Sequence, residues 1–292
     1  RGTDRVVDLP GIYSLSPYTA EEVVTRDFLL REKPDAILNI VDATNIERNL
    51  YLTLQLIELQ RPMVVALNMM DEVVASGGSI DISTLSRELG VEVVPVSAAK
   101  NQGISELIDR VRRVAENRIL PAKMDFCDGP VHRAIHGITH LIEDHAAAAR
   151  IPARFAATKL IEGDAPTLEA IRLNDNELDT LEHITAEMET ALGTDREAAL
   201  ADMRYNYIER LAAVAVHKPK ETREQARSVR IDAVLTNKYL AIPIFLLIMS
   251  LVFWLTFGVV GATLSDWMAA AVEWVTGQVD GALTVFGLNP VV

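Results

Sequence analysis

Hydrophobic residues in the first 120 positions alternate between short β-branched runs and longer stretches with a helical repeat. The runs have the length of buried strands, and the stretches between them place apolar residues three or four positions apart. This alternation is typical of a parallel sheet with helices on both faces. The predicted strands cover residues 4–8, 36–41, 63–67 and 91–96, and the predicted helices cover residues 19–31, 46–60, 82–89 and 104–117.

The pattern changes after residue 122. Residues 123–220 keep a helical period and contain no convincing strand. Glycine and proline interrupt the pattern at 163–166 and again at 193–195, as they do between helices. We therefore predict a partial α/β domain over residues 1–122, followed by an all-helical domain of four or five helices.

A run of 27 residues without a charged side chain extends from Tyr239 to Ser265. Its first part, residues 239–257, is apolar and long enough to cross a bilayer as a helix. We predict a span over about residues 239–260, at the start of a membrane domain that covers residues 239–292. A buried helix of a soluble protein, the competing interpretation, rarely needs so long an uncharged run.

The residues after this span are less decisive. Trp267, Trp274 and Phe286 lie among small residues in the segment 266–288. Their pattern fits an interfacial helix as well as the approach to a second span, and the sequence leaves both open.

Charges are distributed unevenly on the two sides of the apolar run. Residues 239–292 contain only the acidic Asp266, Glu273 and Asp280. The preceding segment contains six basic residues: Lys218, Lys220, Arg223, Arg227, Arg230 and Lys238. The positive-inside rule therefore predicts a basic juxtamembrane connector over residues 221–238, with residues 1–238 in the cytoplasm.

Overall charge and cysteine content narrow the class of protein further. The net charge of −13 argues against a nucleic-acid partner, because phosphate binding needs clustered Lys and Arg. Cys127 is the only cysteine and cannot form an internal disulfide, which indicates a reducing compartment for the soluble part.

Three short motifs follow predicted strands. Asp8-Leu9-Pro10-Gly11 could hold Mg²⁺ through water with its carboxylate, and its glycine would allow the backbone to approach a γ-phosphate. Asn68-Met69-Met70-Asp71 could read guanine, with Asp71 accepting from the ring N1–H and the exocyclic amine while Asn68 braces the neighbouring loop. Ser97-Ala98-Ala99-Lys100 could offer a backbone amide to guanine O6.

The combination of these motifs is more specific than any one of them. A strand-ending turn would explain Asp8-Leu9-Pro10-Gly11 alone, but Asn68 lies 60 residues after Asp8, and Ser97 lies 26 residues after Asp71. This order at successive strand ends predicts a P-loop GTPase-like α/β domain that binds GTP or GDP with Mg²⁺. The all-helical domain and a transmembrane helix follow it.

Longer strings around these motifs resemble the FeoB-type ferrous iron transporters. They are Asp8-Leu-Pro-Gly-Ile-Tyr-Ser-Leu15, Asn39-Ile-Val-Asp-Ala-Thr-Asn45, Ala66-Leu-Asn-Met-Met-Asp71, Leu235-Thr-Asn-Lys-Tyr239 and Pro243-Ile-Phe-Leu-Leu-Ile-Met249. The resemblance implies GTP-dependent uptake of Fe²⁺ across the bacterial cytoplasmic membrane by a multi-pass protein. It also implies contact with membrane lipid, small accessory proteins of iron uptake, and self-association.

The chain departs from the family pattern in several places. It has no G-x-x-x-x-G-K-[ST] motif, so we expect it to be an internal part of a longer protein and to bind GTP poorly by itself. Ile12 stands where Ras-like enzymes have a water-orienting glutamine, which implies slow hydrolysis. Met69 replaces the lysine common in such motifs, which implies a looser hold on the nucleotide.

A stripe of histidines is a weaker candidate site. His132, His136 and His140 recur every four residues, with Glu143, Asp144 and Cys127 near them in sequence. Such a stripe could share a metal ion, but a solvated or partner-facing helix surface is the commoner explanation.

Two alternative functions are also consistent with the sequence. The chain could belong to a regulatory or assembly GTPase whose apolar helix only docks it. It could instead be a membrane-anchored interaction module whose degenerate G domain no longer cycles.

Overall fold

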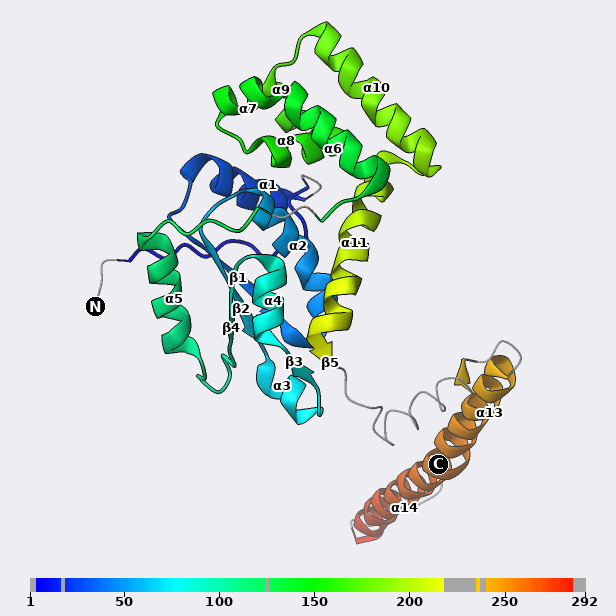
Figure 1. The fold of residues 1–292 in the computed structure, drawn as a ribbon. Helices are drawn as coiled ribbons and strands as arrows, with labels where there is room; N and C mark the ends of the chain where they lie inside the picture. Colours follow the sequence, from blue (N-terminus) through cyan, green and yellow to red (C-terminus); the bar gives the residue numbers. More distant parts are fainter. Residues whose placement is uncertain (1–3, 17–18, 124–125, 218–234, 237–239, 286–292) are drawn as a thin grey trace. The chain divides into compact units, whose positions relative to one another are not determined.

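The structure is a computed structural model that describes residues 4–16, 19–123, 126–217, 235–236 and 240–285. The chain divides into two compact units, residues 1–220 and residues 221–292. The first unit contains the sheet and most of the helices (Figure 1). The second contains the apolar helix.

Three parallel strands form the main sheet among the described residues, in the order β1 (Ile37–Asp42), β2 (Met63–Asn68) and β4 (Glu92–Pro95). The central strand β2 is fully apolar before Asn68 because both of its faces are covered. Val65 and Leu67 belong to the large core of the unit. Val64 and Ala66 point to the other face and pack against α5 (Ile104–Glu116).

The helices around the sheet confirm the predicted α/β fold. α1 (Ala20–Asp27) continues into the π-helical η1 (Phe28–Glu32), and the 3-10 turn η2 (Ala43–Asn45) leads into α2 (Ile46–Glu58). α4 (Ile82–Leu89) has the predicted bounds, and the other predicted helices and strands after residue 18 agree within two residues at each end. The short α3 (Met70–Ala75) and β3 (Ser79–Ile80) were not predicted.

The prediction of a strand over residues 4–8 is wrong. These residues are extended, but no ladder of hydrogen bonds pairs them within the described sheet. Val6 is 89% exposed, and Asp4 Oδ2 instead accepts a hydrogen bond of 2.7 Å from Arg112 on α5. A short β-branched run such as this one cannot form a strand unless a partner edge satisfies its backbone groups.

Six helices follow the sheet in the described residues, one or two more than predicted. They are α6 (Gly129–Leu141), α7 (Glu143–Ala149), α8 (Ala153–Ile161), α9 (Ala165–Ile171), α10 (Asp175–Leu192) and α11 (Arg196–Ala215). Both predicted interruptions occur, where Gly163 and Gly193 adopt φ of 76° and 68°. The three further divisions lie at Ile142, at Arg150 and at Arg172, and the last two residues adopt a left-handed conformation.

The last of these helices returns to the sheet domain. α11 packs along α2 and α4, and after it β5 (Val216–His217) pairs antiparallel with β3. The Tyr207 hydroxyl of α11 donates a 2.6 Å hydrogen bond to the Glu88 carbonyl. One continuous hydrophobic core therefore joins residues of both predicted domains, and the boundary between residues 1–122 and 123–220 stays a prediction.

A buried charge cluster lies where α2, α8 and α11 meet. Arg204 of α11 is fully buried and donates to Glu162 Oε1 at 2.8 Å, and its guanidinium lies 3.5 Å from Glu58 Oε2. Lys159 of α8 donates to Glu162 Oε2 at 2.6 Å. Burial raises the pKa of the Glu58 carboxyl, although Arg204 opposes this shift.

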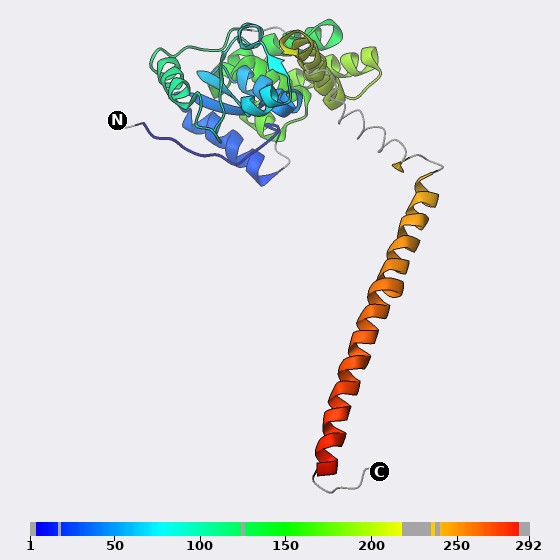
Figure 2. The ribbon, with the colours of Figure 1, turned by 90° about the horizontal axis from the view of Figure 1, so that it is seen from below.

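Residues 241–285 of the second unit follow one another as a single helical rod (Figure 2). It consists of α13 (Ala241–Phe253), the π-helical η3 (Trp254–Gly261) and α14 (Ala262–Val285). Residues Ala241–Ala282 are long and apolar enough to cross a membrane, and none of their most apolar window is buried. The first two residues of the predicted span, 239 and 240, fall outside this helix, and residue 239 lies outside the described residues.

Gly103 fixes the connection between β4 and α5. It is the N-cap of α5 and adopts φ of 76°. A Cβ at this position would lie 2.4 Å from the Pro95 carbonyl oxygen. Only glycine therefore allows α5 to begin this close to the end of β4.

Gly103→Ala should destabilise the chain more than Gly163→Ala, which is its matched control. Gly163 has the same φ, but nothing lies within 4 Å of a Cβ placed there. Both changes add the cost of a left-handed alanine, and only Gly103→Ala adds a clash with backbone, which should cost about 1–3 kcal/mol more. Urea unfolding of the detergent-solubilised chain, followed by far-UV circular dichroism, measures the difference. Equal free energies of unfolding would contradict this account of Gly103.

Arg204→Ala should reduce the free energy of unfolding by about 3–5 kcal/mol, because Glu58 and Glu162 would lose the cation that neutralises them. Arg210→Ala is the control on the same helix, since Arg210 is exposed and lies 3.9 Å from the exposed Asp128. The same urea titration should show little change for this control. A small effect of Arg204→Ala would show that the cluster does not hold the helices together.

Candidate functional site

The carboxyl ends of β2 and β4 bring two of the predicted motifs together. Asn68 is the last residue of β2, and its side-chain Oδ1 accepts a 3.0 Å hydrogen bond from the Ala98 amide. Ligands of parallel sheets bind at this edge, because loops from neighbouring strands meet there. The bracing role predicted for Asn68 thus has a matching contact between the two loops.

Asp71 lies in the first turn of α3, directly after this edge. Met69 adopts a left-handed conformation with φ of 64°, which turns the chain from β2 into α3. The Asp71 side chain is 18% exposed, and Lys100 Nζ lies 3.1 Å from its Oδ2. The Ser97 hydroxyl and then Lys100 hold the pKa of the Asp71 carboxyl below its ordinary value, so that it is ionised at neutral pH.

The ion pair with Lys100 was not predicted from the sequence. Lys100 was already named as the last residue of the Ser97-Ala98-Ala99-Lys100 motif. No spacing rule, however, links a lysine at this position to Asp71. The Ser97 Oγ is buried, and among the described residues no hydrogen bond of ordinary geometry to it is found, although its hydroxyl lowers the pKa of Asp71.

The loop after β4 is a closed turn. Ser97 and Gln102 exchange backbone hydrogen bonds of 3.1 and 3.0 Å. The Ala98 amide is already used by Asn68, whereas the neighbouring Ala99 is exposed and its amide donates no backbone hydrogen bond within the described loop. Ala99 is therefore a second candidate donor to a base, beside Ala98.

The Asp8-Leu9-Pro10-Gly11 motif is not joined to this edge. Asp8 is exposed, and no hydrogen bond or ion pair among the described residues links residues 8–11 to Asn68, Asp71 or residues 97–99. A Cβ on Gly11 would meet nothing within 4 Å. This part of the candidate site stays a prediction.

The segment after Gly11 is held by α2 and by the helical part instead. The Leu15 amide donates to Gln55 Oε1 of α2 at 2.6 Å, and Lys159 Nζ of α8 donates to Ser16 Oγ at 3.2 Å. α1 begins with a capping box between Thr19 and Glu22, and its predicted start at residue 19 agrees with this cap within one residue.

Arg26 of α1 forms a buried bidentate ion pair with Asp164. The two hydrogen bonds are 2.7 and 2.6 Å long, and a third bond of 2.8 Å goes to Thr167 Oγ1. Asp164 also caps α9, where its Oδ2 accepts from the Thr167 amide. Nothing local in the sequence marks Arg26 for this role, because its partner lies 138 residues away.

The histidine stripe is present, but the described residues do not assemble it into a metal site. The rings of His132 and His136 stack at 5.8 Å, and those of His136 and His140 meet edge to face at 4.5 Å. No group of three or more His, Cys, Asp or Glu side chains in the described part of the chain could hold a metal ion.

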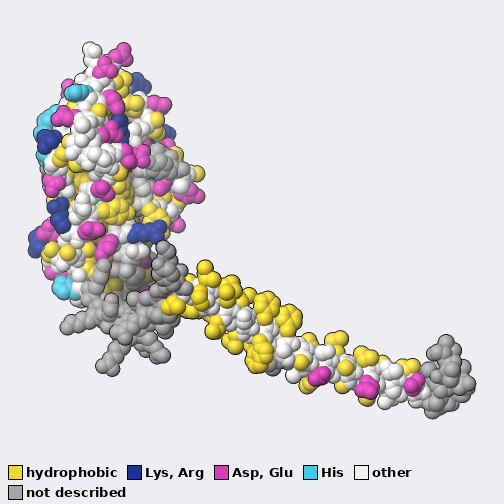
Figure 3. All heavy atoms as spheres, turned by 90° about the vertical axis from the view of Figure 1, so that its right-hand side faces the viewer, with side chains coloured by type: hydrophobic (Ala, Val, Ile, Leu, Met, Phe, Trp, Pro, Cys, Tyr) yellow, Lys and Arg dark blue, Asp and Glu magenta, His cyan; other side chains and the backbone are white. Residues whose placement is uncertain are grey.

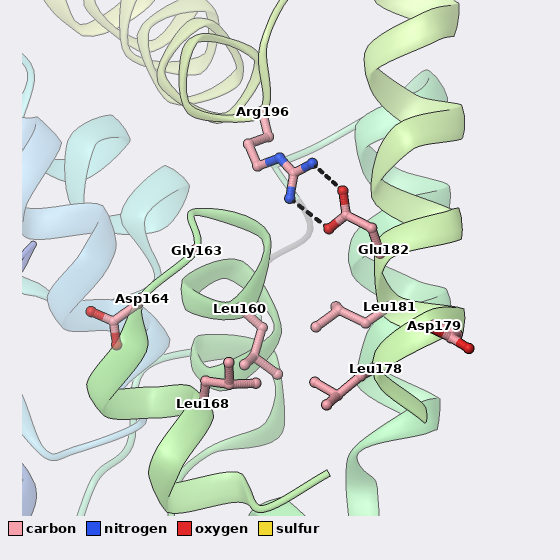
Figure 4. Close-up of a pocket in the computed structure, with 9 residues that line it drawn as sticks. All are labelled: Leu160, Gly163, Asp164, Leu168, Leu178, Asp179, Leu181, Glu182 and Arg196. Atoms are coloured by element: carbon pink, nitrogen blue, oxygen red, sulfur yellow. Dashed lines mark hydrogen bonds and ion pairs between the residues drawn. The ribbon is translucent and has the colours of Figure 1, made fainter. Parts of the chain in front are cut away.

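A pocket of about 340 Å³ lies within the helical part, between α8, α9 and α10 (Figure 4). Leu160, Leu168, Leu178 and Leu181 point toward one another in it. Arg196 at its rim is paired with Glu182 by bonds of 2.6 and 2.9 Å. The residues that line it come from none of the predicted motifs, so this pocket is separate from the candidate nucleotide site.

Comparison with known proteins identifies both halves of the first unit. The sequence profile of the family described as Ferrous iron transport protein B matches residues 2–111, and that of the FeoB cytosolic helical domain matches residues 128–217.

Curated relatives match over most of the chain. A protein named Fe(2+) transport protein A/Fe(2+) transporter FeoB fusion protein from Porphyromonas gingivalis is 36% identical over 94% of this chain and 33% of its own length. The Fe(2+) transporter FeoB of Staphylococcus aureus strain COL is 34% identical over 91% of this chain and 40% of its own length. The chain thus spans between a third and two-fifths of these relatives.

Solved structures agree with the fold. A GDP-bound point mutant of the S. thermophilus FeoB G-domain superposes with a TM-score of 0.67 at 38% identity, over 72% of this chain and 80% of that one. An mGMPPNP-bound NFeoB from S. thermophilus superposes with a TM-score of 0.64 at 37% identity, over 74% and 80% of the two chains. With its parallel sheet, its helical part and its apolar helix, this chain belongs to the FeoB family of ferrous iron transport proteins.

Proposed function

We propose that the chain is part of a protein that takes up Fe²⁺ across the bacterial cytoplasmic membrane and that GTP controls this uptake. The observation that carries the proposal is the edge formed by Asn68, Ala98 and Asp71, in a chain of this family that continues into an apolar helix. Relatives named Fe(2+) transporter and relatives solved with GDP or mGMPPNP support it.

Guanine fits the donors and acceptors of this edge. The ionised Asp71 carboxylate would accept from the ring N1–H and the exocyclic amine, and an amide of Ala98 or Ala99 would donate to O6. Asn68 would hold the second loop in place through its bond to Ala98. Lys100 would have to release Asp71, or share it, when the base binds.

The phosphate end of the nucleotide would involve the first motif. Asp8 would hold Mg²⁺ through water, and Gly11 would face the γ-phosphate, where its open surroundings leave room. The 292 residues contain no glycine-rich phosphate loop, so nucleotide binding by them alone should be weak. Hydrolysis in the whole protein should be slow, because Ile12 cannot orient water.

A nucleotide signal would reach the helical part through the segment after Gly11. Ser16 is held by Lys159, and Arg26 is held by Asp164, so a change at the motif must move or break two buried polar contacts. Coupling between sites needs an element with two arrangements that both sites can bias. α1 would be that element.

The membrane part of the proposal concerns α13. Residues 239–260 would span the cytoplasmic membrane in contact with lipid, and residues 1–238 would lie on the cytoplasmic side, because the basic residues precede the span. Additional spans, accessory proteins of iron uptake and self-association would belong to the whole protein.

Asp71→Asn in the whole protein should weaken GTP binding by roughly 10- to 100-fold, because the amide replaces an acceptor with a donor. The same variant should bind xanthosine nucleotides better than the wild type does, since xanthine presents an acceptor where guanine presents its amine. Glu72→Gln, an exposed neighbour with the same loss of charge, is the control. Fluorescent nucleotide titration checks both, and unchanged GTP affinity of Asp71→Asn would refute the assignment.

Arg26→Lys in the whole protein should separate Fe²⁺ uptake from GTP hydrolysis. Lysine keeps the charge but cannot form the bidentate contact with Asp164. We expect uptake to fall by roughly tenfold, which is within the range of ordinary coupling energies between sites. GTP turnover should change by less than about threefold. Arg31→Lys is the control, because Arg31 pairs with Asp27 at 3.3 Å on the surface. Parallel losses of uptake and turnover, or no loss, would contradict the route through α1.

A further inference from the structure

The second half of the apolar helix differs from the first in one respect. α14 contains Asp266, Glu273 and Asp280 at seven-residue intervals, whereas α13 has no charged residue. Seven residues make nearly two turns of a helix, so the three carboxylates lie on one stripe about 21 Å long. Figure 3 shows them along the C-terminal half of the helix, while hydrophobic side chains cover its N-terminal half.

The opposite face of α14 is apolar from Leu264 to Val275, and Gln278 follows on it. Leu264, Met268 and Val275 lie about half a turn away from the carboxylate stripe. Trp267 and Trp274 lie about a quarter turn from it, at the border between the two faces. Tryptophan is enriched at the boundary of lipid and water, because its ring is apolar and its N–H is polar.

The length of the helix also limits where α14 can lie. Ala241–Ala282 is 42 residues long, which corresponds to about 63 Å, roughly twice the hydrocarbon thickness of a bilayer. α13 and η3 together already use about one thickness. A return of α14 through the bilayer would bring Glu273 to the middle of the lipid, where an ionised carboxylate is costly.

A bend between the two halves has a suitable place. η3 is π-helical from Trp254 to Gly261, and such segments interrupt the regular hydrogen bonds of a helix. Gly258 and Gly261 lie within it, and a Cβ on Gly261 would approach the Thr256 carbonyl oxygen to 3.1 Å. This short segment can therefore turn the chain without a bulky side chain in the way.

We propose that α14 does not cross the membrane but lies in the lipid head-group layer on the side opposite to residues 1–217. The carboxylate stripe faces water, and the face with Leu264, Met268 and Val275 faces the acyl chains. The partner of this helix is thus the lipid surface itself. The inference rests on the proposed function in one respect, which is that α13 and η3 together span the bilayer.

Labelling of single cysteines tests the proposal in the whole chain, inserted in bacterial membranes. Cys127→Ser removes the only cysteine, and each variant adds one back. Asp266→Cys and Asp280→Cys report the two ends of the stripe, Met268→Cys and Val275→Cys report the apolar face, and Ala148→Cys marks the exposed surface of the helical part. A membrane-impermeant maleimide is added to spheroplasts and, separately, to inverted vesicles.

In spheroplasts, Asp266→Cys and Asp280→Cys should react at rates within about threefold of each other and roughly tenfold faster than Met268→Cys and Val275→Cys. Ala148→Cys should react only in inverted vesicles. If Asp266→Cys reacts in spheroplasts and Asp280→Cys only in inverted vesicles, α14 crosses the membrane and the proposal is wrong. Equal rates at all four positions of α14 would place it off the lipid and also overturn the proposal.

If Asp266→Cys and Asp280→Cys instead react only in inverted vesicles, as Ala148→Cys does, the segment formed by α13 and η3 does not span the membrane. The membrane part of the proposed function then fails together with this inference. A second measurement leaves α14 unaltered. In a Trp254→Phe variant, brominated lipids should quench Trp267 and Trp274 at the same shallow depth. Depths that differ by about 10 Å would show a spanning helix and contradict the proposal.

Discussion

Glu58 lies at the end of α2 with its side chain 1% exposed, so its charge depends on cations from other helices. Arg204 of α11 lies between Glu58 and Glu162, and Lys159 of α8 completes the neutralisation of Glu162. Burial alone would raise the pKa of Glu162, but Arg204 and Lys159 outweigh it and hold that pKa below its ordinary value. Ionised groups in such a place are tolerated only when their partners are in position. The cluster therefore restricts how α2, α8 and α11 can pack.

The same cluster extends toward the candidate nucleotide site. Lys159 also donates to Ser16, which follows the Asp8-Leu9-Pro10-Gly11 motif by five residues. A second buried pair, Arg26 with Asp164, holds the next helix. Apolar contacts have no preferred direction, whereas hydrogen bonds between buried charges need a particular geometry, so these bonds add an orientational constraint to the packing of the core. Movement of the segment that follows the motif would therefore strain or break its contacts with the helical part.

The side chains at the sheet edge and those of the apolar helix are governed by different interactions. At the edge, Asn68 and Asp71 are fixed by short loops, because Gly103 lets α5 begin against Pro95 and Met69 turns the chain into α3. A carboxylate held ionised there can discriminate between bases through its acceptors alone. The helix from Ala241 onward has no such contacts within the described residues, and its chemistry is set by which side chains meet lipid and which meet water.

The sequence by itself determined the elements whose signal is local. Hydrophobic periodicity gave α4 its bounds and the three paired strands theirs within a residue, because the period reports which faces are buried. It also located the apolar helix and the motifs at the ends of β2 and β4. Only the tertiary structure showed that residues 4–8 form no strand, since pairing depends on a neighbouring edge and not on alternation. The ion pairs of Arg26 with Asp164 and of Arg204 with Glu58 join residues 138 and 146 positions apart. No local pattern marks such partners, because the path of the whole chain decides which charges are buried together.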